Sequence, residues 1–515
     1  MTGAEPKTVT TETDWPALID DAAHRLRGVA HVTPLAPAPR LSRRLGATVL
    51  LKREDQQPVF SFKLRGAFNR IACLDDAAAA AGVICSSAGN HAQGVALAAR
   101  MRGIPATVVM PRTTPSIKVE AVRDYGAEVI LHGDNYDAAQ SHAHEIAEQR
   151  GRTFIHPFDD VRVIAGQATI GRELLDSGLP FSTVVVPIGG GGLAAGIALA
   201  IKAANPETRI IGVEPAQSAS MLAAFEHGAP VTLPRVGLFA DGVAVRRVGD
   251  QTYALCREFI DEIVTVDTDE TCAAIRDIYE DTRTVVEPAG ALAVAGVRHL
   301  SECGDLGDDN VVAIVCGANL NFDRLRHIAE RAAIGEHREA LFAVRIEEQP
   351  GSFRAFCNRI GDRSVTEFNY RYAGAGDARI FVGIELSGGV EEGAAVLEQI
   401  RAAGYPAEDL SHSELAKLHV RHLVGGRAPG EGNERVYRFE FPERPGALGE
   451  FLDAVGERWN ISLFHYRNHG SDYGRVLAGI QVDDADRVEL DAHLDTLGYP
   501  CWDETDNPAY RLFLT

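Results

Sequence analysis

Residues 182–201 read STVVVPIGGGGLAAGIALAI, and this stretch decides the fold. Its first six residues are mostly β-branched, as in a strand buried on both faces, and its last nine are the small apolar residues of a buried helix. The four glycines between them allow several backbone N–H groups to converge at the helix start, where an anion is favoured. The stretch therefore predicts a strand, a phosphate-binding loop and a helix rather than a plain turn.

The same alternation of apolar strands and helical segments recurs from about residue 46 to 333. The strands include GVICS (82–86), ATVVM (106–110) and NVVAIVC (310–316), and segments with helical periodicity separate them. Near-continuous apolar strands joined by helices are typical of parallel sheets covered on both faces. We therefore expect an α/β catalytic region at residues 1–335, built from two subdomains.

The composition excludes several classes of function. The 515 residues include 51 Lys and Arg against 72 Asp and Glu, a formal net charge of −21. An acidic chain repels nucleic acid and anionic membranes, so we expect neither as a partner. One uncharged stretch, residues 177–201, is long enough to cross a bilayer, but Pro180, Pro187 and the glycines favour strand, loop and buried helix.

The cysteines and the N-terminal residues bear on metal binding and location. Residues 1–14 are polar and lack the apolar core of a signal peptide. Scattered cysteines without paired spacing support neither a zinc site nor a disulfide framework, so we expect no metal and a cytoplasmic protein with reduced thiols. The eight cysteines are at positions 73, 85, 256, 272, 303, 316, 357 and 501.

Two segments of similar sequence follow the catalytic region. PG at 350–351 matches PG at 445–446, and with one inserted residue EFNYR (367–371) aligns with LFHYR (463–467). Each segment has the order strand, helix, strand, strand, helix, as in ferredoxin-like (split βαβ) domains. The repeat therefore predicts two α+β regulatory domains.

The boundaries of these domains follow from composition. The stretch GGRAPGEGNE (425–434) is rich in glycine and predicts a flexible linker. We therefore expect the first regulatory domain at residues 336–424 and the second at residues 435–515.

Lys63 lies in SFKLRGA (61–67), between Phe62 and Leu64, at an expected helix start. A lysine desolvated by apolar neighbours has a lowered pKa, which frees its amine for Schiff-base chemistry. Taken alone, the pattern also fits a lysine whose stem packs at a helix start and whose ammonium reaches water.

Two further motifs follow predicted strands. SSAGNH (86–91) stands between the strand 82–86 and a helix, where backbone N–H groups can bind a carboxylate and Asn90 supplies an amide donor. CGAN (316–319) ends the strand 310–316, on the side of a parallel sheet where ligands bind. Taken alone, the first motif is ordinary in loops and caps, and Cys316 could be a buried apolar side chain.

Together these motifs resemble a known family. SFKLRGA, SAGNHAQG, the GGGGL loop, TRTVVEPAGA (282–291) and CGAN occur in an order similar to that of the fold-type II pyridoxal-phosphate (PLP) enzymes. More specifically, they resemble the biosynthetic threonine dehydratases (threonine ammonia-lyases), whose two ACT-like regulatory domains the tail repeats resemble. The resemblance covers nearly the whole chain, although each motif alone is shared with serine dehydratases and racemases.

The resemblance implies how PLP is held. Lys63 corresponds to the lysine that attaches the cofactor covalently, with Phe62 beside it, and Asn90 to the residue that contacts the phenolic oxygen of the ring. Cys316 falls against the pyridine nitrogen, where similar enzymes commonly carry Ser, so it is a mild departure. The residues implied in phosphate binding are Gly189, Gly190, Gly191, Gly192 and Leu193.

The resemblance also implies the reaction. L-Threonine would undergo β-elimination and deamination to 2-oxobutanoate and ammonia, the first committed step of isoleucine biosynthesis, with Lys63 taking the Cα proton. Its carboxylate would lie on the SSAGNH loop, against Ser87, Ala88, Gly89 and His91. A homotetramer is the implied assembly.

Regulation is implied for the tail repeats. Isoleucine would inhibit and valine would relieve the inhibition, with tyrosine rings as apolar walls and guanidinium groups as carboxylate clamps. The same tyrosines could instead be strand packing residues. The residues at equivalent repeat positions are Tyr370 and Tyr466, and Arg371 and Arg467.

Three positions help to choose among related activities. Ala88 stands where serine racemases have Ser as a second base, so its methyl group favours elimination over racemisation. Glu214 is followed six positions on by Ser220 rather than by the Asp of a divalent-metal site, so we assign no divalent metal, although a monovalent ion stays open. Glu287 precedes a Pro-Ala-Gly helix start, where capping is the preferred interpretation and catalysis the alternative.

Two other functions stay open beside the threonine dehydratase. One is a serine/threonine dehydratase or racemase of broad specificity, against which Ala88 and the double tail argue. The other is a non-catalytic amino-acid sensor on the same scaffold, against which the intact Lys63 argues. A dinucleotide dehydrogenase is excluded, because no acidic residue follows the glycines at the spacing that binds a ribose.

Overall fold

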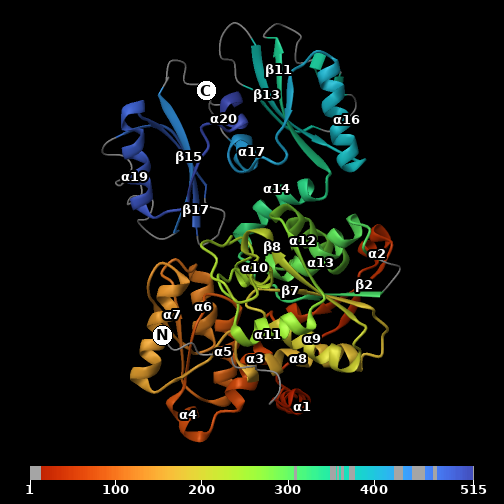
Figure 1. Cartoon of the computed structure of the whole chain (residues 1–515), viewed down its shortest axis with the longest axis vertical. Helices are drawn as coiled ribbons and strands as arrows, with labels where there is room; N and C mark the ends of the chain where they lie inside the picture. The colour runs from red at the N-terminus through yellow and green to blue at the C-terminus, as the bar shows by residue number, and fades with distance from the viewer. Residues whose placement is uncertain are drawn as a thin grey trace. The chain divides into compact units, whose positions relative to one another are not determined.

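The chain forms two compact units, Met1–Phe322 and Asp323–Thr515, each described here by itself (Figure 1). The first unit ends before the expected boundary at residue 335, because Ile334 of α14 (Leu325–Gly335) joins an apolar cluster of the second unit. The structure is a computed structural model that describes residues 13–306, 310–347, 355–356, 359–360, 363, 365–370, 377–422, 433–442, 459–467 and 473–513.

The first unit contains two sheets, which confirms the expected α/β architecture. The larger sheet is parallel except for its edge strand β1, which runs antiparallel to β2. Its order is β1 (Leu35–Pro37), β2 (Thr48–Arg53), β10 (Asn310–Val315), β7 (Thr183–Pro187), β8 (Arg209–Pro215) and β9 (Glu262–Val266). The smaller, fully parallel sheet has the order β5 (Glu128–Leu131), β4 (Ala106–Met110), β3 (Val83–Ser86) and β6 (Thr153–Phe154).

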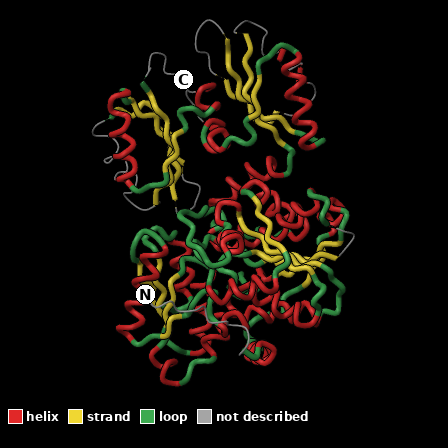
Figure 2. Tube along the Cα trace, viewed as in Figure 1, coloured by secondary structure: helices red, strands yellow, loops and turns green. Residues whose placement is uncertain are grey.

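Helices pack around both sheets of the first unit, as Figure 2 shows. All of these helices carry buried residues, and several begin at a capping side chain or at a proline. They are α1 (Trp15–Arg25), α2 (Pro39–Leu45), α3 (Lys63–Ala72), α4 (Asp76–Ala81), α5 (Asn90–Arg102), α6 (Ser116–Asp124), α7 (Tyr136–Arg150), α8 (Val161–Asp176), α9 (Gly192–Ala204), α10 (Ser220–His227), α11 (Asp250–Phe259), α12 (Thr268–Thr282) and α13 (Pro288–Glu302). Short 3-10 turns are η1 (Glu54–Gln56), η2 (Ala216–Ser218), η3 (Asp241–Val243) and η4 (Phe322–Arg324).

Glycines let three of these helices approach closely. A Cβ on Gly166 of α8 would lie 2.7 Å from Cα of Gly66 in α3, and a Cβ on Gly196 of α9 would lie 2.8 Å from the backbone of α8. Because no side chain fits at these contacts, α3 and α9 both rest on α8. The start of α3, which carries Lys63, and the glycine loop before α9 are thereby held on a common support.

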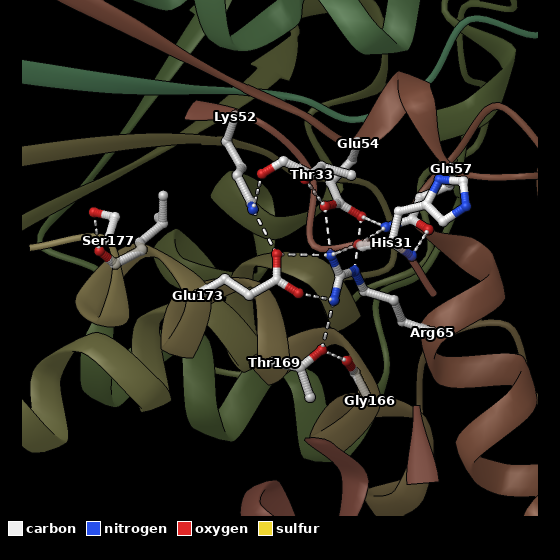
Figure 3. Close-up of polar contacts among 11 residues, drawn as sticks. His31, Thr33, Lys52, Glu54, Gln57, Arg65, Gly166, Thr169, Glu173 and Ser177 are labelled. Carbon is white, nitrogen blue, oxygen red and sulfur yellow. Dashed lines mark hydrogen bonds and ion pairs between the residues drawn. The ribbon is translucent and has the colours of Figure 1, made fainter. Parts of the chain in front are cut away.

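A buried ionic cluster also fixes α3 (Figure 3). We call Lys52, Glu54, Arg65 and Glu173 the Arg65 cluster. The guanidinium of Arg65 donates to both carboxylate oxygens of Glu54, each at 2.8 Å, and to those of Glu173 at 2.6 and 2.9 Å. Lys52 donates to Glu173 as well. Two cations and two carboxylates balance, so the charges of β2, η1, α3 and α8 are paired out of water.

The second unit contains two four-stranded sheets with the same strand order. Second, third, first and fourth strands lie side by side, all antiparallel, as in the split βαβ fold that the repeats predict. The first sheet has β12 (Val365–Tyr370), β13 (Asp377–Glu385), β11 (Glu339–Glu347) and β14 (Ala407–Asp409). The second has β16 (Asn460–Arg467), β17 (Tyr473–Gln481), β15 (Glu434–Pro442) and β18 (Cys501–Asp503).

Helices follow the strands at corresponding places in the two repeats. The first helix of each repeat, both PG pairs and most of the linker 425–434 lie outside the described residues, apart from helical residues 355–356 and 359–360. The others are α16 (Gly389–Ala402), α17 (Glu414–Leu418), η5 (Val420–His422), η6 (Asp484–Asp486), α19 (Arg487–Leu497) and α20 (Pro508–Phe513).

Both repeats carry the same irregularity in their second strand. The pairing shifts register in β12 and again in β16, and after each shift the next residue faces a glycine: Glu367 faces Gly383, and Leu463 faces Gly479. This correspondence agrees with the sequence alignment that uses one inserted residue. The two repeats are therefore equivalent in backbone detail as well as in strand order.

A shared apolar cluster joins the two repeats. Leu341 and Phe381 of the first sheet, Leu415 of α17, Val436 of the second sheet and Tyr510 of α20 all belong to it and are buried. Because residues of both sheets share one core, the tail is a single compact unit.

The uncharged stretch 177–201 holds strand β7, the glycine loop and most of α9. Within the described ranges, no helix has the length and apolarity needed to span a bilayer.

Candidate active site

Three of the expected motifs meet where parallel strands end. The SSAGNH loop follows β3, the glycine loop follows β7, and Cys316 follows β10. An isolated bridge pairs Ser61 with Gly317, and Phe62 N–H donates to the Cys316 carbonyl at 3.2 Å. The segment before Lys63 is thus attached to the end of β10, which brings Lys63 to this edge.

Lys63 is the first residue of α3 and is half-buried. Its Nζ donates a hydrogen bond to the carbonyl of Pro157 at 2.9 Å and lies 5.1 Å from the ring centroid of Phe62. Burial lowers the pKa of Lys63 to about 8, and the nearby Cys316 and Glu287 oppose this shift. A lower pKa increases the fraction of neutral, nucleophilic amine near neutral pH.

The glycine loop leaves a row of N–H groups without acceptors. Gly191 precedes α9 with no side-chain cap, and α9 begins at Gly192. The N–H groups of residues 189–193 make no hydrogen bond within the described part of the chain. Converging free N–H groups at a helix start fit the phosphate of the expected cofactor.

Close neighbours explain why this loop is glycine. A Cβ on Gly190 would lie 2.2 Å from the ring of Phe158, and one on Gly189 would lie 2.9 Å from the backbone of Val243. Gly191 has φ +94°, a conformation that side chains disfavour, and a Cβ there would lie 2.7 Å from Met221. Neighbouring side chains and backbone therefore leave no room for a methyl group in residues 189–191. We call the loop of residues 189–193 the glycine cradle.

The SSAGNH loop offers a second set of free N–H groups. Those of Ala88, Asn90 and His91 make no hydrogen bond within the described residues, whereas Gly89 N–H donates to Ser87 Oγ at 3.2 Å. These N–H groups stand at the start of α5, where they can bind a carboxylate. We therefore call residues 86–91 the carboxylate loop.

The imidazole of His91 is used inside the protein rather than toward the loop. Its Nε2 pairs with the Ile155 carbonyl at 2.9 Å, and the ring is buried. Burial, reinforced by Lys63, lowers the pKa of His91 to about 3. At the loop, only the backbone of His91 is therefore free to bind a ligand.

Asn90 belongs to a chain of side-chain hydrogen bonds. Asn319 Nδ2 donates to Asn90 Oδ1 at 2.6 Å, and Asn90 Nδ2 donates to Glu287 Oε1 at 2.6 Å. The preferred interpretation of Glu287 as a helix cap is wrong, because its side chain makes no cap hydrogen bond to α13 although it stands at the cap position. Its carboxyl instead turns toward Asn90.

The carboxyl group of Glu287 is buried beside the site. Burial raises the pKa of Glu287 to about 7, the charge of Asp241 adds to this shift, and the hydrogen bond from Asn90 opposes it. A Cβ on Gly317 would lie 2.5 Å from Glu287 Oε1, so the glycine of CGAN makes room for this carboxyl. A lone Glu in the apolar run TVVEPAGALAV is the sequence signal for such a buried acid.

Cys316 lies next to Lys63 and Glu287 and is buried. Its Sγ donates to the Ala289 carbonyl at 3.3 Å, and burial raises the pKa of the thiol. The raised pKa favours the neutral form of this thiol.

Sequence reasoning missed the segment 156–160. It follows the two-residue strand β6, too short to leave a pattern, yet Pro157 accepts from Lys63 and Phe158 packs on the glycine loop. Thr252 was missed as well, and its Oγ1 donates to the Gly190 carbonyl at 2.6 Å.

Glu214 serves a helix start. It is buried, and its two oxygens accept from the N–H groups of Met221 and Leu222, each at 2.8 Å. Burial raises its pKa to about 7. Among the described residues there is no group of three or more His, Cys, Asp or Glu arranged to hold a metal.

The expected effector residues lie in the second unit. Tyr370 pairs with Ile380, and Tyr466 pairs with Val476, so the two tyrosines occupy equivalent strand positions. Arg467 ends β16, whereas Arg371 lies outside the described residues. The side chains of these four residues are not among those described, so their part in effector binding stays a prediction.

Comparison with known proteins gives two family matches. The family of pyridoxal-phosphate-dependent enzymes matches residues 26–317. The C-terminal regulatory domain of threonine dehydratase matches twice, over residues 330–420 and 425–514.

Individual relatives match over nearly the whole chain. The biosynthetic L-threonine dehydratase of Burkholderia multivorans is 53% identical over 95% of this chain and 97% of its own length. That of Escherichia coli is 53% identical over 94% of both chains. The mitochondrial threonine dehydratase of Saccharomyces cerevisiae is 47% identical over 94% of this chain and 87% of its own.

Two solved structures resemble the larger part of this chain. The processed form of threonine deaminase isoform 2 from Solanum lycopersicum has a TM-score of 0.61 and 43% identity, over 65% of this chain and 94% of its own. Maize serine racemase has a TM-score of 0.58 and 35% identity, over 60% and 95%. With a lysine and a glycine cradle at the strand ends of one sheet, a carboxylate loop at the strand ends of the other and a duplicated tail, the chain belongs to the pyridoxal-phosphate-dependent enzymes, in the family of biosynthetic threonine dehydratases.

Proposed function

We propose that this chain is a threonine ammonia-lyase that converts L-threonine to 2-oxobutanoate and ammonia, the first committed step of isoleucine biosynthesis. The observation that carries the proposal is the environment of Lys63. Its amine has a lowered pKa and stands at the strand ends of the six-stranded sheet, where the glycine cradle follows β7, while the carboxylate loop follows β3 of the four-stranded sheet. Together these supply a nucleophilic amine, a phosphate site and a substrate anchor.

The residues at this edge fit PLP. In our proposal Lys63 attaches the cofactor, Phe62 lies beside it, and Asn90 contacts the phenolic oxygen through the amide that also donates to Glu287. The thiol of Cys316, whose raised pKa favours its neutral form, would lie against the pyridine nitrogen, and residues 189–193 would bind the phosphate through the free N–H groups of the cradle. Bound there, PLP supplies an electron sink for the negative charge that develops at the substrate Cα.

The substrate is anchored by the SSAGNH loop. Its carboxylate binds at the N-terminus of α5, against residues Ser87, Ala88, Gly89 and His91, where the N–H groups of Ala88 and His91 are free. Ala88 has no proton to give, so proton transfer takes place from one side only. This supports elimination rather than racemisation as the outcome.

Lys63 acts as the base. Once its amine is free it can take the Cα proton, because the lowered pKa leaves part of the amine neutral near physiological pH. Loss of the β-hydroxyl as water leaves an unsaturated amine, which tautomerises and takes up water to give 2-oxobutanoate and ammonia. One water leaves and one enters, so the overall reaction consumes threonine alone.

We infer that the second unit regulates this reaction. Isoleucine as inhibitor and valine as activator would bind at the tail, which we divide at residues 336–424 and 435–515. The equivalent strand positions of Tyr370 and Tyr466, with Arg371 and Arg467 next in sequence, support this inference.

Assembly and location complete the proposal. We infer a homotetramer in the cytoplasm, where free thiols such as the exposed Cys303 stay reduced. Sedimentation of the purified protein measures the assembly, and a monomer would contradict it.

The function is tested at Lys63. Purified wild type should be yellow. Borohydride reduction should attach the cofactor permanently to the peptide that contains Lys63. The Lys63→Ala variant should lose threonine-dependent oxobutanoate formation, because it lacks both the attachment point and the base. Residual turnover close to that of wild type would refute the role of Lys63. A colourless protein that PLP cannot reconstitute would favour a sensor instead.

A further inference from the structure

Residues 156–160 (HPFDD) contact both ends of the proposed cofactor site. The Pro157 carbonyl accepts from Lys63 Nζ at 2.9 Å, while Phe158 lies against the glycine loop. The conformation of this short segment therefore affects both the amine and the phosphate site.

A single nitrogen folds the segment. Nδ1 of His156 accepts the N–H of Asp159 at 2.7 Å and the N–H of Phe158 at 3.3 Å. A ring nitrogen that accepts two N–H groups carries no proton of its own, so the neutral form of this ring has its proton on Nε2. Its ring also meets that of Phe158 edge to face, with centroids 4.7 Å apart.

The charges around His156 are compatible with a neutral ring. Burial lowers the pKa of His156, the carboxylates of Asp159 and Asp160 oppose the shift, and Lys63 and His144 add to it. Lys63 belongs to α3 and His144 to α7, and the two aspartates belong to the segment 156–160 itself, so the groups that act on the imidazole come from three parts of the fold.

Phe158 and Asp159 connect the turn of residues 156–160 to the glycine cradle. The ring of Phe158 occupies the space beside Gly190. A Cβ on Gly192 would lie 3.0 Å from the backbone of Phe158. The carboxylate of Asp159 accepts the N–H groups at the start of α11, including that of Thr252 at 3.1 Å. Thr252 in turn donates to the Gly190 carbonyl.

We propose that His156 is a positioning residue, whose unprotonated Nδ1 folds the 156–160 turn so that the Pro157 carbonyl holds the free amine of Lys63 and Phe158 supports the glycine cradle. The proposal rests on the proposed function, because the free amine is the base of that reaction. His156 itself touches neither the substrate nor the cofactor and acts through Pro157 and Phe158.

Two variants of nearly equal shape distinguish loss of the hydrogen-bond acceptor at position 156 from loss of the imidazole ring. Asn and Leu side chains have nearly the same outline, but only Asn has an oxygen that can accept the N–H groups two and three residues ahead. His156→Asn therefore keeps the acceptor, and His156→Leu removes it. His142→Leu is the matched control, because His142 lies on α7 and pairs with the exposed Glu145.

The holoenzymes are compared in steady-state kinetics and in the rate of PLP release into a trapping protein. For His156→Leu we expect kcat for threonine to fall about 10- to 100-fold, because a base displaced by a fraction of an ångström loses much of its efficiency. KM should change by less than about 3-fold, since the carboxylate loop is untouched, and PLP release should be faster. His156→Asn should lie within about 5-fold of wild type in both measurements.

Several outcomes would overturn the proposal. Equal losses in the Asn and Leu variants would mean that the acceptor atom is irrelevant, and a change of KM alone would place the effect in substrate binding. If His156→Leu does not fold, nitrogen NMR of wild type with labelled histidine decides, with His156→Asn assigning the signal. A protonated Nδ1 in the active protein could not accept the N–H groups of Phe158 and Asp159, and it would refute the proposal.

The two proposals fail in different ways. Wild type and His142→Leu are assayed beside the His156 variants. If neither converts threonine, the proposed function is wrong. If both convert it and His156→Leu does too at an unchanged kcat, only the positioning role is wrong.

Discussion

Burial favours the neutral forms of both Lys63 and Glu287, two of the ionisable groups at the centre of the site. The pKa of Lys63 falls to about 8 and that of Glu287 rises to about 7. The first shift supplies a base, and the second gives a carboxyl that can stay protonated close to neutral pH. A change of solvent pH near neutrality therefore alters the charge inside the site.

Glu287→Gln should alter how the stability of the cofactor-free protein depends on pH. The pKa of Glu287 is higher in the folded state than its ordinary value of 4.5, so its stabilising effect is complete below that value and is lost as pH rises through about 7. Relative to the Gln variant, wild type should lose up to about 3 kcal/mol between acid and alkaline pH. Urea unfolding at several pH values measures the difference, and parallel curves for the two proteins would contradict it.

At this scale the sequence predicted the residues that carry a local pattern. Lys63, Asn90, the glycines and Cys316 stand in compact motifs at expected strand ends or helix starts. The position of Glu287 suggested a cap, because glutamate before a helix is common there. Its actual partner, Asn90, is 197 residues away in sequence, and no local pattern reports such a contact.

Among the elements, the glycine loop shows how packing restricts a sequence. Replacing Gly190 with alanine would place a Cβ 2.2 Å from the ring of Phe158. Relief of such overpacking costs about 1–3 kcal/mol. If the cradle opens to provide that relief, the affinity of Gly190→Ala for PLP should fall about 10- to 100-fold. Absorbance titration of the cofactor-free protein with PLP measures it.

Gly393→Ala is the control for that experiment. Gly393 lies inside α16, where a Cβ would meet only the end of Leu386, at 3.2 Å, and Ala340. Its affinity for PLP should equal that of wild type. An unchanged affinity in Gly190→Ala would mean that Phe158 moves aside without disturbing the cradle.

The Arg65 cluster fixes the helix that presents Lys63. Arg65 holds the pKa of Glu54 below its ordinary value although burial alone raises it. Arg65→Met leaves the buried Glu54 without this partner, and breaking a buried pair costs about 3–5 kcal/mol. Urea unfolding should show a loss of this size. Arg150→Met, which removes an exposed pair with Glu128, should cost less than about 1 kcal/mol.

A loss in Arg65→Met no larger than in Arg150→Met would contradict this account, because it would mean that Lys52 alone compensates both carboxylates. Arg65→Lys should fall between wild type and Met, since an ammonium keeps the charge but not the paired hydrogen bonds to two carboxylates.

The sequence predicted long elements better than short ones. The strands at 83–86, 106–110, 183–187 and 310–315 lie within a residue of the expected runs. Strands β1 and β6 have three and two residues and were missed, because such lengths carry no alternation. The fourth strand and final helix of each tail repeat were missed for the same reason.

On the scale of the whole molecule, the chain divides at Phe322, and the division gives a direct test of regulation. A chain that ends at Phe322 should still convert threonine, because every residue proposed in the site precedes that point. It should lose inhibition by isoleucine and activation by valine. Steady-state kinetics on threonine, with and without each effector, compares it with the full chain. Inhibition that persists would place the effector site in the first unit.

The apolar cluster shared by the two tail repeats has an evolutionary consequence. A duplicated domain can often be lost or exchanged. Here, however, apolar side chains of each copy are buried in a cluster that it shares with the other copy. Deleting one copy would expose to water the apolar side chains that the other contributes to this cluster, which would favour keeping both. The two copies can drift apart in what they sense while neither can be discarded.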